Sequence, residues 1–466
     1  MSNSAPRRRT AFVFITLVSA GALGLTGCAT AAQSGAAASV SGLAAAEAAG
    51  LNVSLYKQAV AEAKSVASDK NLGGNLDYIG GQSGSQAQTL EAAYKAFTDA
   101  TGTKITYTQS GSSVGTTAAI QSRITAGNSP DIVDLSLGQA KAFAKQGYTV
   151  DLTKTIGAST LADNYAPSLL TSLSYKGKVF GVTQGFSNFM IWYDPKSYTG
   201  PVSPTSWKQV VDWTNSAASK GTAPWCIAEE AGGGSGFPGT QFIETLFAKT
   251  YGPQAVADWA DGTLPWTSDK VKGAWQEFGS IALDNSKVSG GVTGALSTNI
   301  STGSNGLVSS PAGCQADLWG SWVPGVIGKD VQPETNLSFY QVPGVVAKYA
   351  STEIYNAGAT VVLKSSPASR AFIKFLASSQ AQALIGSANI WTVANKKVPT
   401  SAYTSPLLKK AAGIYFGSSV SLVAPPDIVA SSAVDAAFNK GVMSYLADPS
   451  TLDSVLASIE AASKAA

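Results

Sequence analysis

Asn75-Leu-Asp-Tyr-Ile79 is typical of a short strand, and the turn-forming run Gly80-Gly-Gln-Ser-Gly84 follows it directly. Residues 87–101 then place apolar side chains at helical spacing, and Gly102 marks the end of that helix. Lys104-Ile-Thr-Tyr-Thr108 alternates as a second strand. A strand, a helix and another strand in this order favour an α/β fold built on a mostly parallel sheet.

The alternation of strands and helices continues toward the C-terminus. Residues 116–126 are expected to form a helix, 131–135 a buried strand and 138–146 another helix. Further strands are expected at residues 178–183, 188–193 and 355–363, and further helices at 204–219, 367–378, 379–385, 431–446 and 451–462. Residues 226–322, rich in Gly and Trp, look more irregular. Because 466 residues exceed one typical hydrophobic core, the length predicts two domains or lobes.

Polar side chains follow three of the expected strands at the point where each strand ends. In open α/β sheets, ligands bind outside the carboxyl ends of the strands. This rule selects a first set of candidate ligand-binding residues, which are Gln82, Ser83, Ser110, Ser136 and Gln139.

Composition excludes several classes of function. The chain has no His, which excludes Ser-His-Asp triads, His-ligated zinc and His general bases. The formal net charge is +3, and Arg7, Arg8 and Arg9 supply three of the positive charges, so the chain beyond residue 27 is neutral. A neutral chain lacks the electrostatic footprint of a nucleic-acid-binding protein. No metal or cofactor is expected. The run 232–236 is not followed by the Gly-Lys-Ser/Thr of a phosphate loop, which argues against nucleotide binding.

Residues 1–27 have the pattern of an export signal. A polar segment ends in three arginines, and the apolar run 11–25 is shorter than the roughly 20 residues that a membrane-spanning helix needs. Leu25-Thr-Gly-Cys28 resembles a bacterial lipobox, which implies that Cys28 becomes the first mature residue and carries lipid. The protein would then be anchored at the outer face of the bacterial cytoplasmic membrane. The competing interpretation is an ordinary secretory signal with a coincidental cysteine.

Residues 28–74 are expected to link the lipid to the folded body. Residues 29–49 are dominated by Ala, Ser and Gly, a flexible spacer composition. Residues 51–70 are helix-like but only weakly amphipathic, which fits either an arm or a short helix that caps the first lobe.

The cysteines fit an exported protein. With Cys28 assigned to lipid, Cys226 and Cys314 remain as an even pair in an oxidising compartment. We expect a disulfide between them that closes a long loop, and the alternative is two unpaired buried thiols.

Several strings resemble one family, the extracellular solute-binding proteins of ABC-type sugar importers. Ala126-Gly-Asn-Ser-Pro-Asp-Ile-Val133 is similar to the family's AGNPPDI signature. Gly177-Lys-Val-Phe-Gly-Val-Thr183 and Met190-Ile-Trp-Tyr-Asp-Pro-Lys196 resemble its GKVYGVP and WYNpk segments. Residues 101–108 resemble its first helix-to-strand passage, and together with the lipobox these strings span nearly the whole chain.

One stretch resembles the α-glucoside-binding subgroup in particular. Pro224-Trp-Cys-Ile227 and Gly236-Phe-Pro-Gly-Thr-Gln-Phe-Ile-Glu244 look like its PWC and GWPGTDWIED strings, and the subgroup's partner cysteine would be Cys314. The chain departs from the subgroup by the loss of one acid and two indoles in 237–242. Phe438-Asn439 also stands where the family has Phe-Trp.

The resemblance implies two α/β lobes joined by crossover segments that close on a ligand. The crossings would fall near 185–188, 355–358 and 422–427. Lobe 1 would consist of 75–186 and 357–425, and lobe 2 of 187–356 and 426–466. The implied partners are a small-molecule sugar and the transmembrane subunits of an ABC permease, and the protein is expected to be a monomer.

The chemistry of sugars selects the remaining candidates. A sugar receptor needs planar aromatic platforms together with hydrogen-bonding carboxylates and amides. Tryptophans at 192, 207, 213 and 275 fall in apolar stripes and are expected in the core. Other suitable side chains lie in loops or at the implied crossings: Ser187, Glu229, Trp319, Trp322, Tyr355, Asn356, Trp391 and Asp427.

The leading hypothesis is a receptor without catalytic activity that captures a carbohydrate, an oligosaccharide or glucoside, and delivers it by lobe closure. One alternative keeps the receptor and changes its cargo to a polyamine, a peptide or an organic anion. Arg123 and Arg370 are the only arginines after residue 27, which argues against anions. A second alternative is a secreted glycoside hydrolase that uses paired carboxylates, for instance Glu229 and Asp317.

Overall fold

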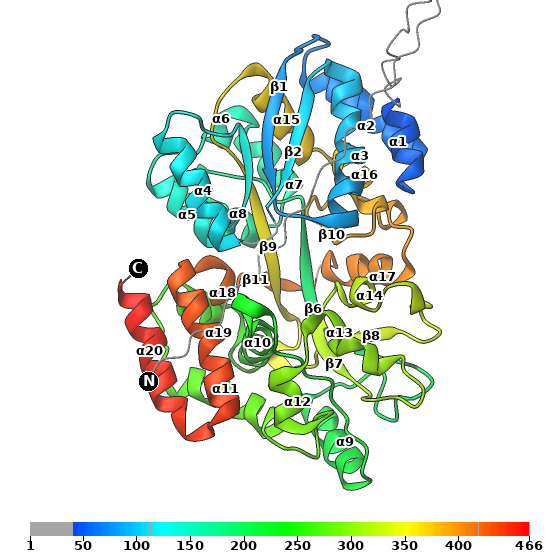
Figure 1. Ribbon diagram of the computed structural model, residues 1–466, viewed down its shortest axis with the longest axis vertical. Helices are drawn as coiled ribbons and strands as arrows, with labels where there is room; N and C mark the ends of the chain where they lie inside the picture. The colour runs from blue at the N-terminus through cyan, green and yellow to red at the C-terminus, as the bar shows by residue number, and fades with distance from the viewer. Residues whose placement is uncertain (1–40, 111–112, 418, 466) are drawn as a thin grey trace, which may run out of the picture. The chain divides into compact units, whose positions relative to one another are not determined.

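The structure is a computed structural model that describes residues 41–110, 113–417 and 419–465. The signal segment and Cys28 lie outside these residues. Within them, a nine-stranded sheet has the order β10-β6-β9-β3-β1-β2, with β7 and β8 paired to β6 and β11 paired to β9 (Figure 1). The strands are β1 Asn75–Gly80, β2 Lys104–Gln109, β3 Ile132–Ser136, β6 Gly185–Tyr193, β7 Asp317–Gly320, β8 Ser338–Gln341, β9 Thr352–Val362, β10 Thr392–Val393 and β11 Ser421–Val423. A separate hairpin pairs β4 Ser174–Tyr175 with β5 Lys178–Val179.

The direction of the strands corrects one expectation. β1 pairs in parallel with β2 and β3, as predicted, but β9 runs antiparallel to β3 and β6, and β6 is antiparallel to β7, β8 and β10. The sheet is therefore mixed rather than mostly parallel. A strand buried on both faces has the same residue pattern in either direction, so its sequence does not report its orientation.

Most of the expected helices are present with shifts of a few residues at their ends. Only residues 178–179 of the strand expected at 178–183 are regular, and Val182 forms an isolated bridge with Thr360. The longer helices are α3 Gly84–Thr101, α4 Ser113–Thr125, α5 Leu137–Lys145, α9 Trp207–Ser219, α10 Phe237–Ala260, α11 Asp269–Ala282, α15 Pro367–Ala377, α16 Ser379–Ser387, α17 Pro406–Tyr415, α19 Ser432–Ala447 and α20 Leu452–Ala465. The shorter ones are α1 Gly42–Ala48, α6 Leu152–Thr155, α7 Ala158–Asn164, α8 Pro167–Ser172, α12 Gly291–Ser297, α13 Ile300–Gly303, α14 Val323–Ile327 and α18 Pro426–Val429.

The stretch that looked irregular contains the longest helix described, α10. This helix is buried on nearly every side and is kinked where Gly252 adopts a φ of 82°, just before Pro253. A helix without a solvent-facing side shows no polar stripe, so periodicity does not reveal it. The expected core tryptophans at 192, 207, 213 and 275 are all buried, which confirms that prediction.

Three strands carry the chain across the middle of the molecule. β6 and β9 lie side by side there, with Ser187 opposite Asn356, and β11 pairs in parallel with β9 (Figure 1). One hydrophobic cluster, around Tyr78, Phe97 and Phe372, lies at one end of these strands and extends along β6 into β7 and β8. A second cluster, which includes Phe242, Trp275 and Phe438, lies at the other end. The fold is thus a two-lobed α/β fold.

A buried ion pair connects α10 to the crossing strand β9. Lys249 Nζ lies 2.7 Å from Glu353 Oε1, and the two side chains are 0% and 2% exposed. Lys249 also donates to the carbonyl of Ala350 at 2.7 Å, and Gln341 Nε2 donates to Glu353 Oε1 at 3.1 Å. With these hydrogen bonds in place, both buried charges are compensated.

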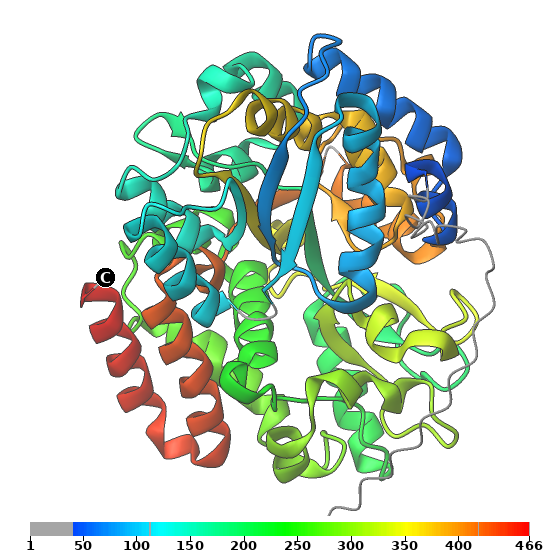
Figure 2. The same ribbon diagram turned by 45° about the horizontal axis from the view of Figure 1, so that its top comes forward.

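The segment before β1 packs on the body. α2 Val53–Val66 lies beside α3 in Figures 1 and 2 and also contacts α15 and α16. Its small residues Ala59 and Ala63 are fully buried, and Asn52 N donates to Ser387 Oγ at 3.2 Å. Of the two interpretations of this segment, the structure supports a helix that covers the first lobe.

Tyr56 gives a measurable test of this packing. Its side chain is 2% exposed, and its hydroxyl donates to Asp99 Oδ2 at 2.8 Å. We expect Tyr56→Phe to lower the free energy of unfolding by about 1 kcal/mol, because it removes only this hydrogen bond and leaves the ring in place. Urea denaturation of the soluble chain from residue 41 measures the change. An unchanged midpoint would contradict the packing of α2 on α3.

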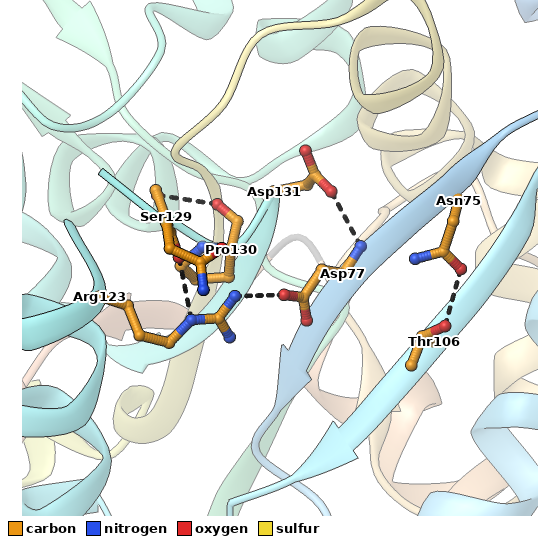
Figure 3. Close-up of polar contacts among 8 residues, drawn as sticks. Asn75, Asp77, Thr106, Arg123, Ser129, Pro130 and Asp131 are labelled. Carbon is orange, nitrogen blue, oxygen red and sulfur yellow. Dashed lines mark hydrogen bonds and ion pairs between the residues drawn. The ribbon is translucent and has the colours of Figure 1, made fainter. Parts of the chain in front are cut away.

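The string that resembles the family's AGNPPDI signature has a structural role here. Arg123 forms an ion pair with Asp77 at 2.5 Å and donates from Nε to the carbonyl of Asn128 at 3.0 Å (Figure 3). Asp131 Oδ2 accepts from the backbone N–H of Asp77 at 2.9 Å. These contacts join the loop between α4 and β3 to the start of β1, at the opposite end of the strands from Ser110 and Ser136.

The expected disulfide between Cys226 and Cys314 is present, with the two Cα atoms 5.4 Å apart. It ties the irregular segment between α9 and α10 to the segment before β7. Across residues 41–110, 113–417 and 419–465, no helix combines the length and apolar composition needed to span a membrane.

Candidate functional site

A cavity of about 740 Å³ lies at the carboxyl ends of β1, β2 and β3, beside the crossing strands. It brings together most of the residues that the sequence selected, although they are separated by up to 345 positions. Those that line it are Gln82, Ser110, Ser136, Gln139, Ser187, Trp322, Asn356, Trp391 and Asp427. The strand-end rule and the implied crossings therefore point to the same place.

Four other candidates are not among the residues that line the cavity. Ser83 is exposed in the turn before α3. Tyr355 is fully buried, and its hydroxyl lies 2.9 Å from Ser172 Oγ. Glu229 and Trp319 are 0% and 5% exposed and line a separate, much smaller cavity of about 20 Å³.

Strand ends and helix starts position the polar side chains on one side of the cavity. Ser110 Oγ donates to the carbonyl of Gly80 at 2.9 Å. Ser136 caps α5 by accepting from Gln139 N at 3.3 Å, and Gln139 Oε1 accepts in return from Ser136 N at 3.2 Å. This reciprocal capping stabilises the start of α5, so both residues have a local structural role as well as a place in the lining.

Asp134 is a lining residue that the sequence did not single out. Its carboxylate accepts from Tyr78 Oη at 2.9 Å, Thr360 Oγ1 at 2.6 Å and Gly81 N at 3.0 Å. Burial raises its pKa, and these hydrogen bonds oppose the shift. Gln184 joins the network by donating to Tyr78 and Thr360. Since protein donors occupy this carboxylate, we interpret Asp134 as a group that organises the strand ends.

Trp322 is the aromatic side chain best placed to face a ligand. It is half-buried, and its ring stacks on Phe237 at 6.1 Å and 22° and lies edge-on to Phe189 and Trp319. A side chain at Gly320 would overlap the indole, so the close approach requires glycine there. Neighbours on several sides thus fix the ring while part of it lines the cavity.

A second indole belongs to the opposite lobe. Trp391 lines the cavity next to the crossing strand β6, where its ring lies against Gly185. A side chain at Gly185 would overlap this ring, so β6 carries glycine at its first position. The buried Nε1 of Trp391 has no hydrogen-bond partner among the described residues.

The side of the cavity formed by α18 and α19 contains a group that we call the acceptor corner: Asp427, Asp435 and Asn439, with Glu244 of α10 directly behind Asp427. Burial raises the pKa of Asp427 to about 7 and that of Asp435 to about 6. Burial and the charge of Asp427 hold the pKa of Glu244 well above its usual range. Among the described residues, no Lys or Arg forms an ion pair with these carboxyls.

Sequence reasoning missed Asp435, Asn439 and Phe237 as lining residues. Asp435 and Asn439 are four residues apart on α19, so they lie on one face of that helix, but nothing in the sequence shows which face meets the cavity. Phe237 follows the Gly-rich run 232–236, and this loop was the available signal. Within the described part of the chain, no three His, Cys, Asp or Glu side chains are arranged to hold a metal ion.

Comparisons with known proteins agree with this architecture. The α-glucosides-binding periplasmic protein AglE of Rhizobium meliloti is 28% identical over 400 residues, which cover 82% of this chain and 85% of that protein. The osmoprotective compounds-binding protein GgtB of Synechocystis sp. is 24% identical over 372 residues, which cover 79% of this chain and 87% of that protein. Both relatives are named as binding proteins rather than enzymes.

Solved structures share the fold. A chitin oligosaccharide binding protein superposes with a TM-score of 0.69 at 19% identity, covering 84% of this chain and 99% of its own. The maltose/maltodextrin-binding domain MalE of Bdellovibrio bacteriovorus, bound to maltotriose, gives 0.63 at 16% identity, covering 84% and 99%. The family model described as bacterial extracellular solute-binding protein matches residues 80–383. The chain belongs to the family of bacterial extracellular solute-binding proteins.

Proposed function

We propose that this chain is the substrate-binding component of an ABC importer and that it captures a carbohydrate outside the membrane. The observation that carries the proposal is the lining of the large cavity. It combines two indoles, Trp322 and Trp391, with hydroxyl, amide and carboxyl side chains, and the described residues that form it include no Lys or Arg. Such a surface offers apolar faces to sugar C–H groups and hydrogen-bond partners to hydroxyls. The name of AglE, which refers to α-glucosides, supports the same class of ligand.

Lobe closure would complete the site. Trp322 precedes α14 and Trp391 precedes β10, so the two indoles come from segments on opposite sides of the crossing strands. A ligand that contacts both favours the closed form over the open one, because it binds the closed form more tightly. In this scheme lobe 1 consists of 75–186 with 357–425, and lobe 2 of 187–356 with 426–466. The loaded, monomeric receptor then delivers the sugar unchanged to the permease.

Attachment through lipid on Cys28 would keep the receptor at the outer face of the cytoplasmic membrane. The spacer up to residue 41 would then separate the lipid from the body, whose first helices cover lobe 1. Metabolic labelling with a radioactive fatty acid should mark the wild-type protein and not the Cys28→Ser variant.

The geometry does not favour a glycoside hydrolase. Glu229 and Asp317 line the cavity of about 20 Å³, which has room for about one water molecule and not for a glycosidic bond. Glu229 Oε2 accepts from Gly239 N at 3.0 Å, and Asp317 Oδ2 accepts from Ser304 Oγ at 2.7 Å. Both carboxyls are therefore interpreted as structural.

A thermal-shift panel tests the proposed function. At a free ligand concentration one hundred times the Kd, a true ligand stabilises the folded protein by about 2.7 kcal/mol, which raises the Tm by several degrees. We expect at least one mono-, di- or oligosaccharide to produce this rise. A panel in which only amino acids, peptides or polyamines raise the Tm would contradict the carbohydrate ligand.

A further inference from the structure

We infer that the acceptor corner binds a protonated amine on the ligand, so that the preferred cargo is a carbohydrate that carries an amino group. This inference rests on the proposed function and specifies it further. It depends on the arrangement of Asp427, Asp435 and Asn439 at one side of the cavity.

The corner presents more hydrogen-bond acceptors than donors. Asn439 donates one of its two side-chain N–H hydrogens to Asp435 Oδ1 at 3.0 Å, which leaves its second N–H and its side-chain oxygen as the remaining groups. The backbone N–H of Asp427 donates to Glu244 Oε1 at 2.9 Å. The two residues before Asp427 are Pro425 and Pro426, which have no N–H to offer. The hydroxyl of Ser432, also in the lining, can accept as well as donate.

Two of these acceptors are buried and have no partner. Asn439 is 8% exposed, and its Oδ1 has no hydrogen-bond partner among the described residues. Asp427 Oδ1 likewise has no partner of good geometry, whereas Glu244 Oε2 lies against the Asp427 carboxyl, with which the protonated Glu244 can share its proton. A buried polar atom without a partner is destabilising by about 1–3 kcal/mol, so this corner is incomplete until something donates to it. Asp134 differs, because protein donors occupy its carboxylate.

The negative charge of the corner also favours an ammonium group as its ligand. Among the described residues, Lys249 of α10 pairs with Glu353, and the lysines of the adjoining helices α5 and α19 (Lys141, Lys145 and Lys440) are neither in the lining nor paired with these carboxyls. An ammonium group brings three donors, no acceptor and one positive charge. A neutral hydroxyl brings one donor and leaves the carboxylate charge uncompensated. The ammonium therefore matches both the hydrogen bonding and the charge of the corner.

The experiment compares sugars that differ only in one substituent. Glucose and galactose, with their 2-amino, 6-amino and 2-acetamido derivatives, are titrated into the wild-type protein by calorimetry, and spermidine is included. We expect an amino sugar to bind at least tenfold more tightly than its neutral counterparts. Its affinity should rise between pH 5 and pH 7.5, because Asp435 and Asp427, with pKa values of about 6 and 7, lose protons over this range. The acetamido sugar should show no such rise.

Asp435→Asn removes one charge from the corner with little change in size. We expect this variant to lose the amino sugar's advantage by at least tenfold, so that the amino sugar and its neutral counterpart bind with similar affinity. The control is Asp212→Asn, which removes an equal charge from an exposed i,i+4 pair with Lys208 on α9 and should change neither affinity.

The titrations distinguish failure of this inference from failure of the proposed function. If neutral sugars bind as tightly as amino sugars, or if Asp435→Asn weakens both equally, the inference is overturned and the carbohydrate function stands. If spermidine binds and no sugar does, the proposed function and this inference both fail.

Discussion

Trp322→Ala should weaken carbohydrate binding by about 2 kcal/mol, roughly thirtyfold in Kd. The indole lines the cavity, and Phe237, Phe189 and Trp319 hold it in place, so its loss removes a rigid apolar platform that is already in position before the ligand arrives. Calorimetric titration with the sugar that gives the largest thermal shift measures the effect. Trp322→Phe should recover part of the affinity, because a smaller aromatic face remains.

Trp319→Ala is the matched control, three residues earlier in strand β7. Trp319 is 5% exposed and lies outside the lining of the large cavity. Its removal should lower the free energy of unfolding by about 3–5 kcal/mol, as for other buried tryptophans, and should weaken binding less than Trp322→Ala, because it loosens the Trp322 ring without removing it. If Trp322→Ala binds the sugar with wild-type affinity, Trp322 is not the aromatic platform. Trp391 is then the remaining indole in the described lining.

Lys249→Met should lower the free energy of unfolding by about 3–5 kcal/mol. The substitution keeps an unbranched side chain of similar length but leaves Glu353 buried at 2% exposure without its cation, which lies 2.7 Å away in the wild type. Desolvation already raises the pKa of Glu353, and Lys249 opposes that shift. In the variant, Glu353 should therefore take up a proton on folding, and the destabilisation should shrink as the pH falls.

Two further variants isolate the ion pair. Lys249→Met combined with Glu353→Leu should recover much of the lost stability, because no buried charge is left without a partner. Lys208→Met, at a side chain 79% exposed, should change stability by less than about 0.5 kcal/mol. Urea denaturation of all four proteins at pH 5 and pH 8 measures these differences. Equal losses in the single and double variants would show that packing, and not the charge on Glu353, accounts for the effect.

The sequence predicted cavity residues correctly where a clear strand pattern is followed directly by polar side chains. The ends of β1, β2 and β3 follow directly from strand patterns, and they placed Gln82, Ser110 and Ser136 at the cavity. Prediction failed for the helix α10 and for the direction of β9. Both elements are buried on nearly all sides, so their sequences show no polar stripe and no sign of orientation. Prediction also selected Glu229 and Trp319 by residue type, whereas the structure buries both behind the cavity.

The sequence by itself determined the α/β class, the core tryptophans and the pairing of Cys226 with Cys314, because each depends on local periodicity or composition. The crossings near 185–188 and 355–358 were implied only by the resemblance to the family. Only the tertiary structure decided which indole faces the cavity and that Asp427, Asp435 and Asn439 meet beside Glu244. The physical reason is that these side chains lie on helices and loops whose faces are chosen by packing between distant segments. A helix can bury any of several faces, and the neighbours that select one are up to about 200 residues away along the chain.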